Sequence, residues 1–157
     1  MTQANVTAVR AFFAAVNRGD LDDAVEALDR ECEFDWSRSR SPERGLYRGQ
    51  EEVKRLYVRF IESWTEREFF ETEIIASGDA VVRVGGFRGR GKGSGVVTSA
   101  SAALLWTFRD GKAISARMYQ TKAEALDAIG LGTWLPLRAI CSSPRGVPKT
   151  SVTPRSG

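Results

Sequence analysis

Residues 6–37, with the sequence VTAVRAFFAAVNRGDLDDAVEALDRECEFDWS, decide the fold class of this chain. Apolar residues recur at helical spacing in the first half of the stretch, and Gly19 and Asp20 then suit the end of one helix and the N-cap of the next. A strand is expected at 31–38, because apolar and polar residues alternate there. Two helices followed closely by a strand predict a helical layer folded over a sheet, and such a layer encloses a pocket.

The rest of the body predicts one further long helix and a run of strands. The polar segment 38–49, with Pro42 and Gly45, is expected to form a loop. Apolar residues from 53 to 64 then fall on one helical face. Turn signals separate the residues that follow into strands, and Asp110-Gly111 marks a tight turn. The expected strands cover 68–76, 79–89, 97–109 and 112–120, and a short helix covers 122–129. This order predicts an α+β fold, in which a cone-shaped, curved, mostly antiparallel sheet holds three N-terminal helices in its concavity.

Composition divides the chain into a domain at 1–130 and a tail at 131–157. The chain has 157 residues, of which 42% are hydrophobic, so one domain can bury its own core. Four of the five prolines lie in the tail, which has no periodic pattern and is expected to be largely disordered. The tail has basic but no acidic residues, so it accounts for the net charge of +3. The body is near neutral and has no strong field for nucleic acid.

The sequence gives no indication of export or membrane insertion. No apolar run approaches the length of a membrane span, and the first residues lack the pattern of a signal peptide. The two cysteines, Cys32 and Cys141, lie in unrelated contexts, so no disulfide framework is expected. We therefore expect a cytoplasmic protein that does not bind membranes.

Three segments of the body carry a family resemblance. They are VRAFFAAVNRGDLDDAVEAL at 9–28, GLYRGQEEVKRLY at 45–57 and LLWTFRDGKAISARMY at 104–119. Over about residues 4–130, the chain resembles the SnoaL-like and ketosteroid isomerase-like branch of the nuclear transport factor 2-like superfamily. The resemblance implies the fold but leaves the reaction open, because this fold hosts isomerases, dehydratases, epoxide hydrolases, cyclases and non-catalytic subunits.

The resemblance to ketosteroid isomerases can be tested at three positions. Their reaction needs a carboxylate base, and it needs a Tyr and a protonated Asp that donate hydrogen bonds to the developing oxyanion. The corresponding positions here hold the apolar residues Phe12, Trp36 and Leu104. Ketosteroid-type isomerisation is therefore not expected. A shift of one residue in the alignment would instead bring Asp35 into the pocket as a base, and this alternative stays open.

The chain contains no histidine, which narrows its chemistry further. The dehydratases of this fold use a histidine with a carboxylate, and histidine is also a common metal ligand. Epoxide hydrolases of the fold hold a water molecule with an Asn. The only asparagines here, Asn5 and Asn17, both lie on the first helix, so the chain does not match the epoxide hydrolase pattern. We expect no metal and no other cofactor.

The alternation along the strands assigns a set of side chains to the pocket. We expect a strongly apolar cavity that binds a flat hydrophobic molecule, polyketide-like or aromatic, with no ionisable group near its centre. The same residues could equally form an ordinary core. The expected ligand-binding residues are Phe12, Trp36, Arg38, Tyr57, Phe60, Trp64, Leu104, Trp106 and Met118.

Some polar side chains are candidates for contact with a ligand, among them Arg38 near the expected mouth, and others lie on the outer face of the sheet. Candidates for polar recognition are Arg38, Tyr47, Arg48 and Arg83. In the expected register, Asp35 and Arg117 point to the outer face. Relatives with this fold often dimerise through that face, so we expect a homodimer or a surface ion pair there.

The segment FRGRGKGSG at 87–95 partly resembles two known patterns, a phosphate-binding loop and an RNA-binding tract. It nearly matches a phosphate-binding loop, but Gly93 replaces the Ser or Thr that binds Mg²⁺, and a strand follows instead of a helix. One short copy is also weak support for an RNA-binding tract. A charged hairpin tip explains it better. Binding of a small hydrophobic molecule is therefore favoured over a cofactor-independent cyclase, isomerase or hydrolase using Asp35, and over a dimerisation or nucleic-acid accessory module.

Overall fold

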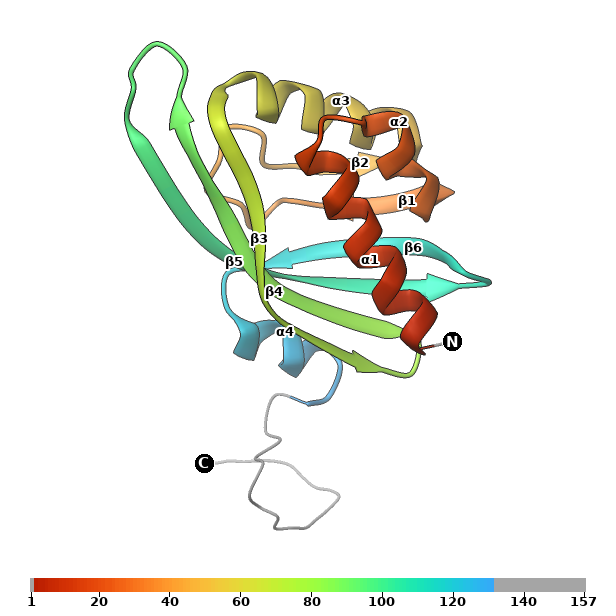
Figure 1. The fold of residues 1–157 in the computed structure, drawn as a ribbon. Helices are drawn as coiled ribbons and strands as arrows, with labels where there is room; N and C mark the ends of the chain where they lie inside the picture. Colours follow the sequence, from red (N-terminus) through yellow and green to blue (C-terminus); the bar gives the residue numbers. More distant parts are fainter. Residues whose placement is uncertain (1, 132–157) are drawn as a thin grey trace, which may run out of the picture.

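The computed structural model describes residues 2–131, and the predicted tail and Cys141 lie outside the described residues. The helices and strands follow one another as in Figure 1. They are α1 (Thr2–Asn17), α2 (Leu21–Ala24), the 3-10 turn η1 (Val25–Ala27), β1 (Leu28–Asp35), β2 (Leu46–Arg48), α3 (Gly49–Glu62), β3 (Trp64–Ser77), β4 (Ala80–Gly91), β5 (Val97–Arg109), β6 (Lys112–Tyr119) and α4 (Lys122–Ala128). Within this range no helix is long and apolar enough to cross a membrane.

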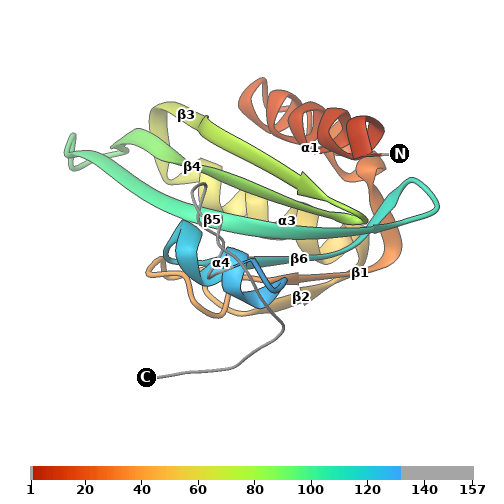
Figure 2. The ribbon, with the colours of Figure 1, turned by 90° about the horizontal axis from the view of Figure 1, so that it is seen from below.

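The six strands form one curved sheet, and the predicted α+β architecture is confirmed. Their order is β2-β1-β6-β5-β4-β3, and all neighbouring pairs are antiparallel except β1 and β6. Helices α1 and α3 pack on the concave face, whereas α4 lies against the opposite face (Figure 2). The concave face therefore receives the main core, and its open end is available for a cavity.

The break between α1 and α2 follows the predicted capping. Gly19 has a φ of +82°, a left-handed conformation that favours glycine. The Asp20 carboxylate then accepts a hydrogen bond of 3.1 Å from the backbone N–H of Asp23. This N-cap satisfies a donor at the helix start that would otherwise lack a partner. Gly19 and Asp20 thus produce a sharp turn after α1, and the chain continues through α2 and η1 into β1.

Several boundaries differ from the predicted ones. Residues 46–48, expected in a loop, form the edge strand β2 beside the end of β1. Strand β1 covers Leu28–Asp35 rather than 31–38, and β3 covers Trp64–Ser77 rather than 68–76. Trp64, expected on the last turn of α3, is the first residue of β3. Its apolar side chain nevertheless faces the same cavity, which explains why it continued the helical pattern.

Two consecutive glycines bend β4 at the floor of the concavity. A Cβ atom on Gly85 would lie 2.1 Å from the carbonyl oxygen of Phe70, and one on Gly86 would lie 2.1 Å from that of Ala100. No side chain fits at such distances, so glycine permits the neighbouring strands to approach β4 closely. Beyond this bend the β4–β5 hairpin extends outward (Figure 1). The bend therefore shapes the open end of the sheet.

Candidate ligand-binding cavity

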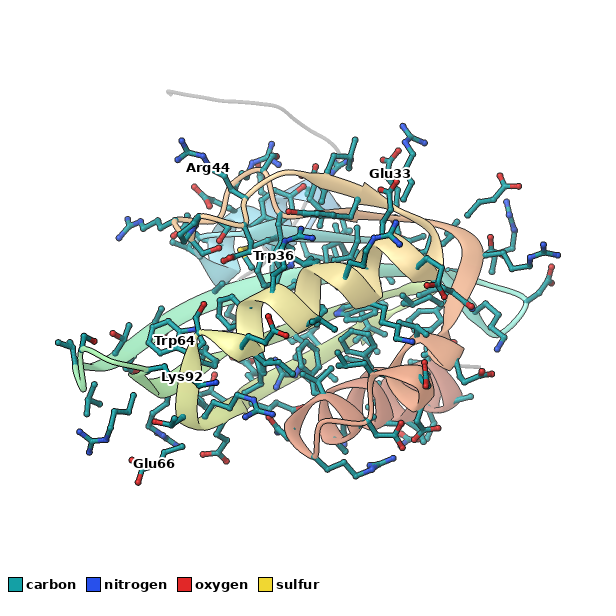
Figure 3. All side chains as sticks on the ribbon, turned by 90° about the horizontal axis from the view of Figure 1, so that it is seen from above. Glu33, Trp36, Arg44, Trp64, Glu66 and Lys92 are labelled. Atoms are coloured by element: carbon teal, nitrogen blue, oxygen red, sulfur yellow. The ribbon has the colours of Figure 1, made fainter. Side chains whose placement is uncertain are left out.

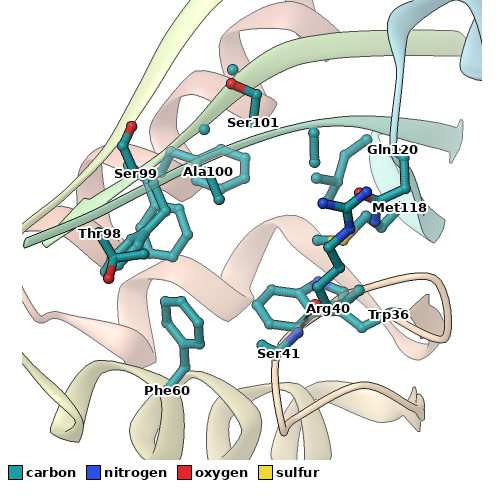
Figure 4. Close-up of a pocket in the computed structure, with 18 of the residues that line it drawn as sticks. Trp36, Arg40, Ser41, Phe60, Thr98, Ser99, Ala100, Ser101, Met118 and Gln120 are labelled. Atoms are coloured by element: carbon teal, nitrogen blue, oxygen red, sulfur yellow. Dashed lines mark hydrogen bonds between the residues drawn. The ribbon is translucent and has the colours of Figure 1, made fainter. Parts of the chain in front are cut away.

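A cavity of about 570 Å³ lies between α3, the loop after β1, and the bent parts of β3, β4 and β5 (Figure 4). Its wall is largely aromatic and aliphatic. Six of the nine predicted ligand-binding residues line it: Trp36, Tyr57, Phe60, Trp64, Leu104 and Met118. Phe13, Phe69 and Phe87 complete the aromatic wall, although the sequence pattern did not assign them to the pocket.

Trp36 and Trp64 contribute to this wall from opposite ends of the chain segment that contains α3. Figure 3 shows both near one end of that helix. The ring of Phe60 lies between them, with its centroid 5.6 Å from that of Trp36 and 6.1 Å from that of Trp64. The indole Nε1 of Trp36 is buried and has no hydrogen-bond partner among residues 2–131. The aromatic wall therefore includes a donor without a partner.

Phe12, Trp106 and Arg38 do not line the cavity, contrary to expectation. The rings of Phe12 and Trp106 lie 5.2 Å apart and are 1% and 0% exposed, so they fill the core between α1 and the sheet. Trp106 shares its face of β5 with Leu104, but it lies two residues further toward the part of the sheet that α1 covers. Arg38 is exposed, and its guanidinium stacks 5.0 Å from the ring centre of Tyr119.

Asp35 points away from the cavity, as the unshifted register predicts. Its Oδ2 lies 3.4 Å from Nε of Arg117, and its Oδ1 accepts a hydrogen bond from the backbone N–H of Ser37. Burial raises the pKa of Asp35, but the hydrogen bonds from Ser37 and the charge of Arg117 together lower it below its ordinary value. An ionised, paired carboxylate on the outer face cannot remove a proton from a molecule in the cavity. The alternative with Asp35 as the base is therefore not supported.

The expectation of a cavity without an inner ionisable group is wrong, because Arg83 lines it. Arg83 lies on β4 beside Leu104 of β5, which is in turn paired with Met118 of β6. Its side chain is 5% exposed, and its guanidinium lies 3.7 Å from the ring centre of Phe13. Burial lowers the pKa of Arg83, and the charge of Glu71 partly restores it. A cation thus lies within an otherwise apolar wall.

Tyr57 is the second polar group on the inner wall. Burial raises the pKa of its hydroxyl well above the ordinary value, and the positive charge of Arg83 reduces this shift. The hydroxyl therefore remains protonated and able to donate a hydrogen bond. Arg83 and Tyr57 together make the inner wall a region of hydrogen-bond donors.

The mouth of the cavity is polar. Arg40 and Ser41 come from the loop after β1, whereas Thr98 and Ser101 come from β5 (Figure 4). Gln120, just after β6, donates a hydrogen bond to the carbonyl of Arg38 and so ties this loop to the sheet. The loop that carries Arg40 is therefore held at the cavity rather than extended into solvent.

Two candidates for polar recognition, Tyr47 and Arg48, lie outside the cavity. The Tyr47 hydroxyl donates to the backbone carbonyl of Glu43 at 2.5 Å. The guanidinium of Arg48 forms an ion pair of 2.9 Å with Glu33, which points away from the helical layer (Figure 3). Arg48 therefore links β2 to β1, and Tyr47 holds the loop before β2.

The glycine-rich segment forms the outer end of the β4–β5 hairpin and contributes little to the cavity beyond Phe87. Arg88 pairs with Glu68 at 2.7 Å, and Arg90 pairs with Glu66 at 2.9 Å. Glu66 lies at the edge of the molecule away from α1 (Figure 3), and the backbone N–H of Lys92 donates a hydrogen bond of 3.0 Å to the carbonyl of Ser63 at the end of α3. Cross-strand ion pairs therefore account for both arginines without a phosphate or nucleic-acid ligand.

Comparisons with known proteins agree with this architecture. The family model of the SnoaL-like domain matches residues 9–116, more than half of the chain. No curated protein matches the sequence. The described residues also contain no group of three or more His, Cys, Asp or Glu side chains that could hold a metal ion.

Solved structures with the same fold include proteins of several descriptions. An NTF2-like protein from Burkholderia xenovorans LB400 is 27% identical, with a TM-score of 0.63 over 82% of this chain and 97% of that chain. TerC, co-crystallized with polyporic acid, is 19% identical, with a TM-score of 0.65 over 81% and 98%. A hypothetical protein of ketosteroid isomerase-like fold from Catenulispora acidiphila DSM 44928, in complex with trimethylamine, is 18% identical, with a TM-score of 0.64 over 82% and 97%.

Proposed function

Because this chain belongs to the SnoaL-like domain family, we propose that it binds a small, flat, aromatic or polyketide-like molecule in the cavity beneath α3. The observation that carries the proposal is the aromatic wall around about 570 Å³ of space, with Trp36, Phe60 and Phe87 among its members. Ligand pockets of this size are typically apolar with a few fixed polar groups. The co-crystallisation of TerC with polyporic acid shows that a protein of this fold accommodates an organic acid.

Binding is favoured over proton abstraction as the role of the cavity. Among residues 2–131, no carboxylate lines it, and Asp35 lies on the other face of the sheet. The remaining lining groups are hydroxyls, amides, arginines and aromatic rings. At neutral pH these groups donate hydrogen bonds or pack against a ligand more readily than they accept a proton.

Filling the cavity tests this proposal. Ala102 lines the cavity and is paired with Gly85, so Ala102→Phe places a ring in the space that the ligand would occupy. We expect the variant to bind the neutral probe 2-naphthamide at least ~10-fold more weakly than the wild type. Calorimetry measures the affinity, and quenching of tryptophan fluorescence, to which Trp36 and Trp64 in the cavity wall contribute, is a second measurement.

The matched control places the same ring on the other side of β4. Arg88 follows the cavity residue Phe87 and is exposed, so Arg88→Phe leaves the cavity open. We expect this variant to bind 2-naphthamide as the wild type does. Equal affinities for all three proteins would exclude the cavity as the binding site.

We also propose that the chain forms a homodimer through the outer face of the sheet. Helix α4 covers Val82, Ala103 and Leu105 on this face. The cross-strand pair Thr107 and Ser115, on β5 and β6, remains half-exposed beyond it. The cavity opens on the opposite face, so this contact would leave it free.

A further inference from the structure

Both charged residues that line the cavity within residues 2–131 are arginines, Arg83 on the inner wall and Arg40 at the mouth. We propose that the ligand is an aromatic anion whose delocalised oxyanion, a carboxylate or an ionised enol, binds Arg83. This inference rests on the proposed function and names the class of molecule that the same cavity takes.

The first argument is the incomplete hydrogen bonding of Arg83. Its side chain is 5% exposed, and its buried Nε has no hydrogen-bond partner in the described part of the chain. A buried donor without a partner costs free energy, and the cost is larger for a charged group. Nε itself is enclosed by the protein, so an anionic ligand in the cavity would accept hydrogen bonds from the Nη groups of the same guanidinium and thereby offset its charge.

The second argument is that the nearest carboxylate is engaged elsewhere. Oε1 of Glu71 lies 3.7 Å from Nε of Arg83, beyond hydrogen-bond distance. Oε2 of the same carboxylate accepts a hydrogen bond of 2.8 Å from Nη2 of Arg10. Two guanidinium groups therefore share one carboxylate, which leaves an excess positive charge beside the cavity. That excess favours a negative ligand and disfavours a cationic one.

The third argument is the shape of the surroundings. The ring of Phe13 covers one side of the Arg83 guanidinium, at 3.7 Å from the ring centre. Leu104 and Met118 continue the same row across β5 and β6 and give an apolar floor. A flat acid can therefore place its ring on this floor while its oxygen atoms reach Arg83. A neutral hydrocarbon would leave the guanidinium without an acceptor.

A pair of probes that differ only in charge tests the inference. At neutral pH, 2-naphthoate is an anion, whereas 2-naphthamide has nearly the same shape and is neutral. We expect the wild type to bind 2-naphthoate at least ~10-fold more tightly, because a hydrogen bond between two charged groups is stronger than one to a neutral acceptor. Arg83→Met should remove this preference while 2-naphthamide still binds.

Three further variants locate the charge effect. Arg88→Met removes an exposed arginine that does not line the cavity, so it should keep the preference for 2-naphthoate. Arg40→Met should keep most of it, because Arg40 lies at the mouth. Glu71→Gln should increase the preference, because it removes the one carboxylate near Arg83. If Arg83→Met fails to fold, the Glu71→Gln variant still tests whether the charge of Arg83 determines the preference for 2-naphthoate.

The outcomes separate this inference from the proposed function. If the wild type binds both probes equally in the cavity, or if Arg40→Met rather than Arg83→Met abolishes the preference, the assignment to Arg83 is wrong but the cavity still binds ligands. An unchanged preference in Glu71→Gln also contradicts it. If neither probe binds the wild type, both proposals fail.

Discussion

Arg83 and Cys32 are both buried, but burial has different consequences for the two side chains. Burial lowers the pKa of Arg83, yet guanidinium keeps its proton at neutral pH because its ordinary pKa is so high. Burial raises the pKa of the Cys32 thiol to about 12, with smaller effects from Asp29 and Glu33. Arg83 is therefore a charge that needs an acceptor, whereas Cys32 is a neutral member of the core.

The raised pKa of Cys32 predicts a loss of stability at alkaline pH. Above about pH 9.0 the unfolded chain releases a proton that the folded chain retains up to about pH 12. The contribution of Cys32 is therefore complete below pH 9.0 and declines as the pH rises toward 12. Relative to Cys32→Ala, the wild type should lose about 1 kcal/mol between neutral pH and about pH 10, measured by urea unfolding. Parallel pH profiles for the two proteins would contradict this.

At the scale of the elements, the sequence predicts which face of a strand a side chain lies on better than it predicts whether that side chain reaches the cavity or the closed core. Alternation along β5 correctly gives Leu104 and Trp106 the same face, but α1 covers only the second, so only Leu104 reaches the cavity. Tertiary packing, which alternation does not encode, makes that difference. Strand β2 was missed because three residues in a polar loop carry no period, and only pairing with β1 makes them a strand.

Strand β4 shows why Arg83, although a candidate for polar recognition, was not expected on the inner wall of the cavity. One face of this strand has Val81 and Arg83, and the other has Val82 and Val84. The sequence therefore predicts two apolar faces, with one arginine as the exception. Both faces are in fact covered, because α4 packs on the side of Val82. A single charged residue in such a strand could pair locally or face a cavity. The positions of Glu71 and Arg10 on other elements decide between these, and sequence spacing does not reveal them.

The bend in β4 yields a prediction of its own. Gly85→Ala places a Cβ atom 2.1 Å from a backbone carbonyl that has no room to move, because Phe70 is itself paired in the sheet. We expect this variant to lose more than about 3 kcal/mol of stability, or to remain unfolded, in urea or thermal melts. Gly93→Asn is the control, since Gly93 has a left-handed φ of +88° with open space around it and Asn tolerates that conformation. Equal stability of the two variants would show that the strands can separate.

At the scale of the whole molecule, the two faces of the sheet have separate tasks. The concave face holds the core and the cavity, and the outer face holds α4 and the ion pair of Asp35 with Arg117. The order of helices and strands predicted helices in the concavity, and the strand register placed Asp35 and Arg117 on the outer face, but neither predicted that α4 packs there. The ligand does not follow from that order, because it depends on which few side chains reach the cavity.

The proposed homodimer is a property of the outer face alone, which allows it to be separated from ligand binding. Light scattering should give a mass of about twice the 17.3 kDa of one chain. Thr107→Lys places a charge beside Ser115, where the partner's sheet would bury it without a counter-ion, so it should shift the protein toward monomer. Because the cavity lies on the other face, the affinity for 2-naphthamide should stay unchanged. A wild-type monomer at all concentrations, or a Thr107→Lys dimer as tight as the wild type, would place any self-association elsewhere.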